Sequence, residues 1–149
     1  IVYLHNSGGA PELKSAERTS YGMRVEYTAD PATQEAGVTG VRSDFTGITM
    51  NAQIFEGTAF TTQFYNTFTP IDDERFVLHS RLHIKDSGSA EINEAIGKAF
   101  TDRFMFEVEQ DLKVLDYKRH LVKPRLCAGD GPIHQYRKYA TKFFVSDPA

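Results

Sequence analysis

An aspartate lies within an apolar helix face, where a charged side chain needs a specific reason. Residues Ser89–Lys118 repeat apolar side chains at spacings of three, four and seven, which predicts one long amphipathic helix. Asp111 falls on the apolar face of this helix. An unpaired carboxylate there would cost on the order of several kcal/mol or lose its charge. Asp111 is therefore either a partnered structural acid or a metal ligand. The apolar face consists of Ile96, Phe100, Phe104, Val108 and Leu115.

Histidines would be needed to complete a metal site around Asp111. Non-haem ferrous iron is commonly bound by two histidines and one carboxylate, with the remaining positions open to oxygen and substrate. His5 is the candidate partner, and the residues themselves leave the second histidine unassigned. His79 and His83 lie on a predicted strand roughly 13 Å apart, too far to share one ion at metal–nitrogen distances of about 2 Å. We expect their strand face to be solvated or to form a subunit contact.

Other reactive side chains carry weaker signals. Glu107 lies four residues before Asp111 but toward the flank of the apolar face, so we expect a solvated glutamate. Cys127 has no neighbouring histidine or CxxC partner and is expected to be inert. His120 and His134 lie among charged and loop residues without an evident partner. The sequence has no dinucleotide, P-loop, GxSxG or HExxH motif.

Composition limits the class of protein. A chain of 149 residues with net charge −3 fits one domain with a substantial core. Lysine and arginine are scattered, so neither nucleic acid nor an anionic membrane surface is expected as a partner, and no apolar run could span a membrane. A single cysteine excludes a disulfide framework and favours a reducing, cytoplasmic setting. The chain opens on Ile1–His5 without an initiator methionine, so we expect a fragment of a longer protein.

The segments before the long helix are predicted to be mainly strands. Ile1–Asn6 is expected to end a helix or strand at the turn Ser7–Pro11, and both Glu12–Arg18 and Asp30–Ala36 are expected to be loops. Alternation with a period of two predicts the strands Tyr21–Thr28, Val38–Phe45, Ile48–Phe55, Ala59–Pro70 and Arg75–Lys85.

The order of these elements predicts an α+β fold. Consecutive antiparallel strands followed by a long helix indicate a curved antiparallel sheet wrapped on that helix. Ser87 or Ser89 can cap the helix. A final helix is expected at about Ile133–Phe144, with Phe143 or Phe144 packed inward. The aromatic, threonine-rich strand faces either enclose a cavity for an apolar ligand or simply fill the core, which is the commoner arrangement.

Several C-terminal features together resemble one enzyme family. They are Gln110–Asp111 on a long helix, the KPRLC segment Lys123–Cys127, the DGP segment Asp130–Pro132, and an aromatic final helix ending in Phe143–Phe144. With these features, Glu109–Phe144 resembles the C-terminal end of Rieske-type oxygenases, nearest the 3-ketosteroid 9α-hydroxylase oxygenase component and the cholesterol 7-desaturases. The opening Ile1–His5 resembles the end of that family's Asp-x3-His-x4-His motif.

The resemblance implies that residues 1–149 form one catalytic domain with a helix-grip, START-like fold. His5 would be the second iron histidine and Asp111 the carboxylate ligand, with the first histidine immediately before Ile1. The implied cofactors are a mononuclear Fe(II) and a [2Fe–2S] cluster in an absent upstream Rieske domain. The implied partners are O2, a sterol-like or aromatic ring substrate, an electron-transfer reductase and the other subunits of a homotrimer. Without the upstream domain and its histidine, the chain alone is not expected to turn over.

Two functions are compatible with this sequence. As an iron oxygenase, the domain would bind its substrate in an apolar pocket. As a metal-free START-like lipid- or steroid-binding module, it would use Asp111 as a buried structural acid. A histidine immediately before Ile1 and a CxH…CxxH pair further upstream would favour the oxygenase. The residues expected to line the pocket are Met50, Phe60, Phe64, Phe68, Phe100 and Phe104.

Overall fold

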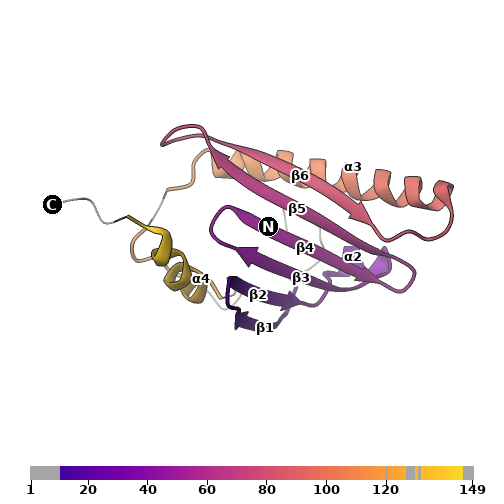
Figure 1. Ribbon diagram of the computed structural model, residues 1–149, viewed down its shortest axis with the longest axis horizontal. Coiled ribbons are helices and arrows are strands. Elements are labelled where there is room, and N and C mark those ends of the chain that lie inside the picture. Colours follow the sequence, from indigo (N-terminus) through magenta and orange to yellow (C-terminus); the bar gives the residue numbers. More distant parts are fainter. Residues whose placement is uncertain (1–10, 120, 127–129, 131, 146–149) are drawn as a thin grey trace.

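The structure, a computed structural model, confirms an α+β fold and describes residues 11–119, 121–126, 130 and 132–145. The expected element at Ile1–Asn6 lies outside the described residues. Six antiparallel strands pair in sequence order to form one sheet (Figure 1). The strands are β1 (Leu13–Arg18), β2 (Gly22–Tyr27), β3 (Val38–Thr46), β4 (Met50–Gly57), β5 (Thr61–Pro70) and β6 (Phe76–Ile84). The helices are α2 (Pro31–Glu35), α3 (Ala90–Leu115) and α4 (Ile133–Ala140), followed by the 3-10 turn η2 (Thr141–Phe143).

Two segments expected to be loops are regular elements. Residues 12–18 contain β1, which pairs with β2 at the edge of the sheet. An edge strand with mostly exposed side chains shows no apolar alternation, so residues 13–18 carry no strand signal. Residues 30–36 contain α2, whose first turn is held by Asp30, with its carboxylate accepting the Thr33 N–H at 3.0 Å. A helix of one turn is too short to show a helical period.

The long helix is confirmed with only its ends adjusted. Ser89 caps α3, and its hydroxyl accepts the backbone N–H of Ile92 at 3.4 Å. Leu115 is 44% exposed, so it does not extend the covered face as its spacing predicts. The final helix is shorter than expected, and Phe143 and Phe144 are exposed rather than packed inward. Among the described residues, no helix has the length and apolar character needed to cross a bilayer.

All the described helices pack on one face of the sheet, which we call the inner face. Phe100 of α3 makes edge contacts with Phe55 and Phe60, each at a centroid distance of 5.5 Å. One turn later, Phe104 stacks on Phe64 at 4.6 Å and 19°. These ring contacts fix α3 lengthwise along β5 and β6, as Figure 1 shows.

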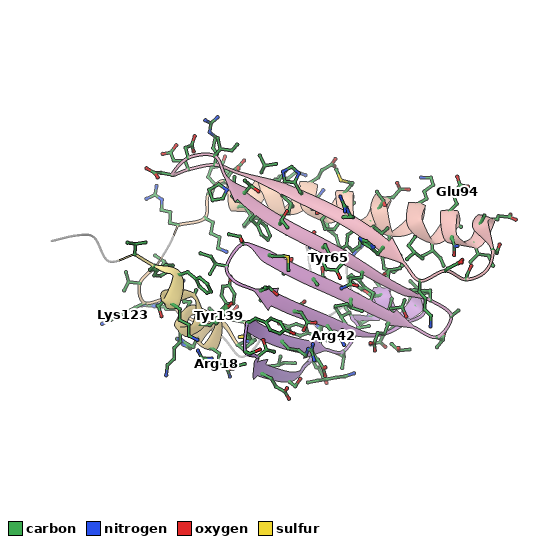
Figure 2. The ribbon with its side chains drawn as sticks, viewed as in Figure 1. Arg18, Arg42, Tyr65, Glu94, Lys123 and Tyr139 are labelled. Carbon is green, nitrogen blue, oxygen red and sulfur yellow. The ribbon has the colours of Figure 1, made fainter. Side chains whose placement is uncertain are left out.

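The C-terminal helix α4 covers another part of the inner face. Its Tyr136 ring lies 5.3 Å from that of Phe45 on β3. The buried Tyr139, labelled in Figure 2, donates its hydroxyl hydrogen to the backbone oxygen of Tyr21 at 3.1 Å. A segment more than a hundred residues from β2 is thus tied to its start.

No described helix packs on the opposite, outer face. Arg24 and Arg42 both lie beside Asp44 on this face, at 2.6 and 3.3 Å. At the other side of the sheet, Tyr65 makes an edge contact with His83 at 5.3 Å. Arg42 and Tyr65 are labelled in Figure 2. The outer face is therefore largely polar, and the ion pair of Arg24 with Asp44 links β2 to β3.

Gly22 permits the close pairing of β2 and β3. A Cβ added at Gly22 would overlap the backbone oxygen of Phe45, whereas a Cβ at Gly40 would meet nothing within 4 Å. We predict that Gly22→Ala lowers the free energy of unfolding by about 2 kcal/mol or more, because backbone cannot move aside cheaply. Gly40→Ala is the matched control and should change it by less than about 0.5 kcal/mol. Urea unfolding followed by circular dichroism measures both, and equal effects would contradict this account.

The stack of Phe104 on Phe64 should dominate the attachment of α3. We predict that Phe104→Ala lowers the free energy of unfolding by about 2–3 kcal/mol. This is at or below the usual range for truncation of a phenylalanine, because the ring is only half-buried. Phe106 lies on the exposed side of the same helix, so Phe106→Ala should cost about 0.5 kcal/mol. The same unfolding measurement checks both variants. A similar cost for the two would mean that α3 is not held by this ring pair.

Candidate functional site

Asp111 lies on the side of α3 that faces the sheet. It follows Phe104 by seven residues, two turns further along the same helix face, and is half-buried. The ring stack of Phe104 on Phe64 shows that this helix face covers the inner face of the sheet. The half-burial of Asp111 fits this position on the helix.

An apolar cavity of about 220 Å³ lies between α2, the inner face of the sheet and α3. Phe64, Phe100 and Phe104 line it, as expected, and Phe60 packs against Phe100 beside it. The cavity reaches along α3 as far as Glu107, which is one helical turn, or about 6 Å, before Asp111. The cavity and the carboxylate thus share one side of the sheet.

The remaining two predicted lining residues lie elsewhere. Phe68 is on the inner face but packs against Phe76 at 5.6 Å, beyond the cavity. Met50 pairs with Thr67, so it lies on the outer face, away from α3. The expectation that Met50 lines the pocket is therefore wrong. The sequence argument assumed that the apolar side of this strand faces the helix, whereas the side of β4 bearing Met50, Ala52 and Ile54 faces outward.

The inner side of β4 is instead polar at two positions that the sequence argument missed. Gln53 lines the cavity beside Phe55 and Phe64. Asn51 is directly opposite Asn66 of β5, which is directly opposite Ser80 of β6. We call Asn51, Asn66 and Ser80 the polar row. The amide side chains on this side of the strand were the only signal in the sequence. They indicate a polar site only once the inward face of the strand is known.

The polar row is partly hydrogen-bonded. Ser80 donates its hydroxyl hydrogen to Oδ1 of Asn66 at 2.6 Å, and Asn66 is only 6% exposed. The Oδ1 atom of Asn51 is buried and has no hydrogen-bond partner among the described residues. Leaving such an acceptor unpaired costs about 1–3 kcal/mol. Asn51 does not line the apolar cavity, but Gln53, two residues further along the same side of β4, does. An uncompensated polar atom on this face favours a ligand-binding role over simple core packing.

Charged and phenolic groups also border this region. Glu107 is not a freely solvated glutamate, because it accepts a hydrogen bond from Arg103 at 2.6 Å at the cavity wall. Burial raises the pKa of the Tyr136 phenol above its ordinary value, and the nearby Tyr139 raises it further. Tyr136 is therefore a neutral hydroxyl near neutral pH.

The other candidate residues are not gathered at this site. His79 and His83 lie on the exposed outer face, and His134 is exposed on α4. His5, His120 and Cys127 lie outside the described residues. Within the described part of the chain, no group of three or more histidine, cysteine, aspartate or glutamate side chains is placed to hold a metal. Asp111 alone of the proposed ligand pair is therefore placed by the structure.

Comparison with known proteins identifies the family. A family model described as the 3-Ketosteroid 9alpha-hydroxylase C-terminal domain matches residues 9–144. The chain is 27% identical over 132 residues to a 3-ketosteroid-9-alpha-monooxygenase, oxygenase component, of Rhodococcus rhodochrous, covering 83% of this chain and 34% of the relative. A second such component from the same organism is 28% identical over 94 residues, covering 62% of this chain and 25% of the relative. The chain thus spans between a quarter and about a third of these relatives. The resemblance inferred from the C-terminal features is confirmed: the chain belongs to the family of 3-ketosteroid 9α-hydroxylase C-terminal domains, and so to the C-terminal domains of Rieske-type oxygenases.

Proposed function

We propose that this chain is the catalytic domain of a Rieske-type mononuclear iron oxygenase acting on an apolar, steroid-like ring substrate. The observation that carries the proposal is the position of Asp111, a half-buried carboxylate on the inner side of α3, one turn beyond an apolar cavity. Family membership supports the same function. We further propose that the sheet and α3 together form the helix-grip, START-like fold.

The donor set fits ferrous iron chemically. We propose that Asp111 and His5 are the ligands in this chain and that the other histidine stands immediately before Ile1. A carboxylate with two imidazoles is a donor set typical of non-haem Fe(II), which when bound supplies oxygen activation at its open positions. No cysteine is required at such a site, whereas the [2Fe–2S] cluster that delivers electrons would belong to an upstream domain.

The residues of the chain itself bind and orient the substrate. The rings of Phe64, Phe100 and Phe104 bury apolar surface and exclude water from the cavity. The ion pair between Arg103 and Glu107 sits at the same wall, so it gives the cavity one polar edge against which a largely apolar molecule can be oriented. Asp111 lies beyond this edge along α3, where a bound ring would approach the iron ligands.

The partners follow from the proposed class. Electrons would come from a reductase through the Rieske cluster of a neighbouring subunit, and O2 is the co-substrate. We propose a homotrimer, and a soluble cytoplasmic setting is consistent with the single cysteine. The exposed His79, Arg81 and His83 on β6 are candidates for a subunit contact.

Loss of the carboxylate should separate the proposed iron function from a structural role. We predict that Asp111→Ala in the full-length oxygenase reduces bound iron below about a tenth of the wild-type content, because one of few ligands is lost. The fold should persist, since a charge is removed from an apolar face. Metal analysis and circular dichroism of the purified protein give the two readouts.

Glu109→Ala is the matched control, because Glu109 is exposed on the same helix. The Glu109→Ala protein should bind as much iron as the wild-type protein and should be equally stable. If Asp111→Ala instead unfolds the protein, or if wild-type protein and variant both lack iron affinity, the metal-free lipid- or steroid-binding module would be the better account.

The oligomeric state tests the proposed assembly. We expect light scattering of the full-length protein at micromolar concentration to give the mass of a trimer. Replacing Arg81 by Glu should weaken the assembly if β6 contributes to the contact, since charge reversal at a contact costs several-fold or more in affinity. The control Arg75→Glu changes an exposed arginine in the turn before β6. A monomeric wild-type protein would contradict the proposal.

A further inference from the structure

The polar row crosses three neighbouring strands in register. Asn51 of β4 is opposite Asn66 of β5, and Asn66 is opposite Ser80 of β6. All three side chains lie on the inner face, in the strand layer that carries Phe45 on β3. Opposed residues on antiparallel strands have Cβ atoms about 4.5–5.5 Å apart. The row is therefore a compact group of hydrogen-bonding atoms on the inner face, with Ser80 at its exposed end.

The row lies below the turn of α3 that precedes Asp111. Phe104 stacks on Phe64, so distances along α3 and along β5 can both be counted from this ring pair. From that pair, Asn66 is two residues along β5, or about 6.6 Å, and Asp111 is seven residues along α3, or about 10.5 Å. The two elements run the same way, because Phe100 contacts Phe60 and Phe104 contacts Phe64. The row thus lies between the apolar cavity and the level of the proposed iron ligand.

The hydrogen-bonding capacity of the row is specific. Asn66 uses its Oδ1 to accept from Ser80, so its Nδ2 group is the donor that it can offer to a ligand. Asn51 presents a buried Oδ1 that accepts from no described residue. The row therefore offers one donor and one acceptor from adjacent strands. A hydroxyl group can accept from the first and donate to the second, whereas a ketone can only accept.

We propose that the polar row is a subsite for a hydroxyl group on the apolar ring substrate, which donates to Asn51 and accepts from Asn66. This inference rests on the proposed function, because it assumes that the space between sheet and helix binds a ring substrate. The relatives are named for action on 3-ketosteroids. The proposal gives this chain a preference for an alcohol over the matching ketone.

The test compares two steroid probes that have the same ring skeleton and differ in one oxygen, a 3-hydroxyl or a 3-ketone. Equilibrium dialysis against the full 149-residue chain measures both affinities. We expect the wild-type chain to bind the alcohol about tenfold more tightly. Asn51→Leu should remove most of that difference by weakening the alcohol alone.

Two further variants keep the test decisive. Gln63→Leu is the matched control, because Gln63 lies on β5 but is opposite Ile54 on the outer face, and it should leave both affinities unchanged. Asn51→Asp retains an acceptor and should keep the preference for the alcohol, even if Asn51→Leu fails to fold. Equal affinities in the wild-type chain, or a preference for the ketone, would overturn the subsite but leave the oxygenase proposal standing. Failure to bind either probe would overturn the subsite together with the proposed substrate class, whereas iron binding by Asp111 is measured separately.

Discussion

The stacking of Phe104 on Phe64 is the contact on which the rest of the site depends. It ties a helix of 26 residues to the inner face of the sheet and sets its position along β5 and β6. Because a helix advances about 1.5 Å per residue, one fixed contact determines which strand residues lie below every later turn. For this reason, Asp111 and the polar row lie at similar distances from the Phe64–Phe104 pair along the helix and the sheet. A slip of one turn would move the carboxylate by about 5.4 Å relative to the amides.

The inner face is a compromise between packing and binding. Edge contacts of Phe100 with Phe55 and Phe60, together with the stack of Phe104 on Phe64, attach the helix and leave a cavity beside them. A sheet built only for stability would place apolar side chains opposite one another on this face. The amides at Asn51 and Asn66 interrupt that pattern, and one of their oxygens stays buried without a partner among the described residues. Such groups lower stability unless a ligand satisfies them, which is the expected balance at a binding site.

The outer face shows how the sheet remains stable with no described helix above it. Ala52 and Ile54 are buried there although their neighbours are polar. Asp44 lies beside Arg24 and Arg42. The hydrogen bond that its carboxylate accepts from Arg24 is the main reason that the pKa of Arg24 is raised. Partly exposed pairs of this kind contribute modestly to stability, but they keep the face polar, and the Arg24–Asp44 pair also links β2 to β3.

The sequence by itself determined the local elements and the family. The long helix, its cap and the main strands follow from apolar periods of 3.6 and two, and the C-terminal segments identified the oxygenase relatives. The strand β1 and the one-turn helix α2 were missed, since exposed edge strands and single turns carry no period. Only the tertiary structure decided which side of β4 faces the helix. Alternation specifies that two faces differ, but not which one packs inward. Here Asn51 and Gln53 face the interior while Met50 faces out, because the ring contacts of Phe55 and Phe64 with α3 fix the orientation of the sheet.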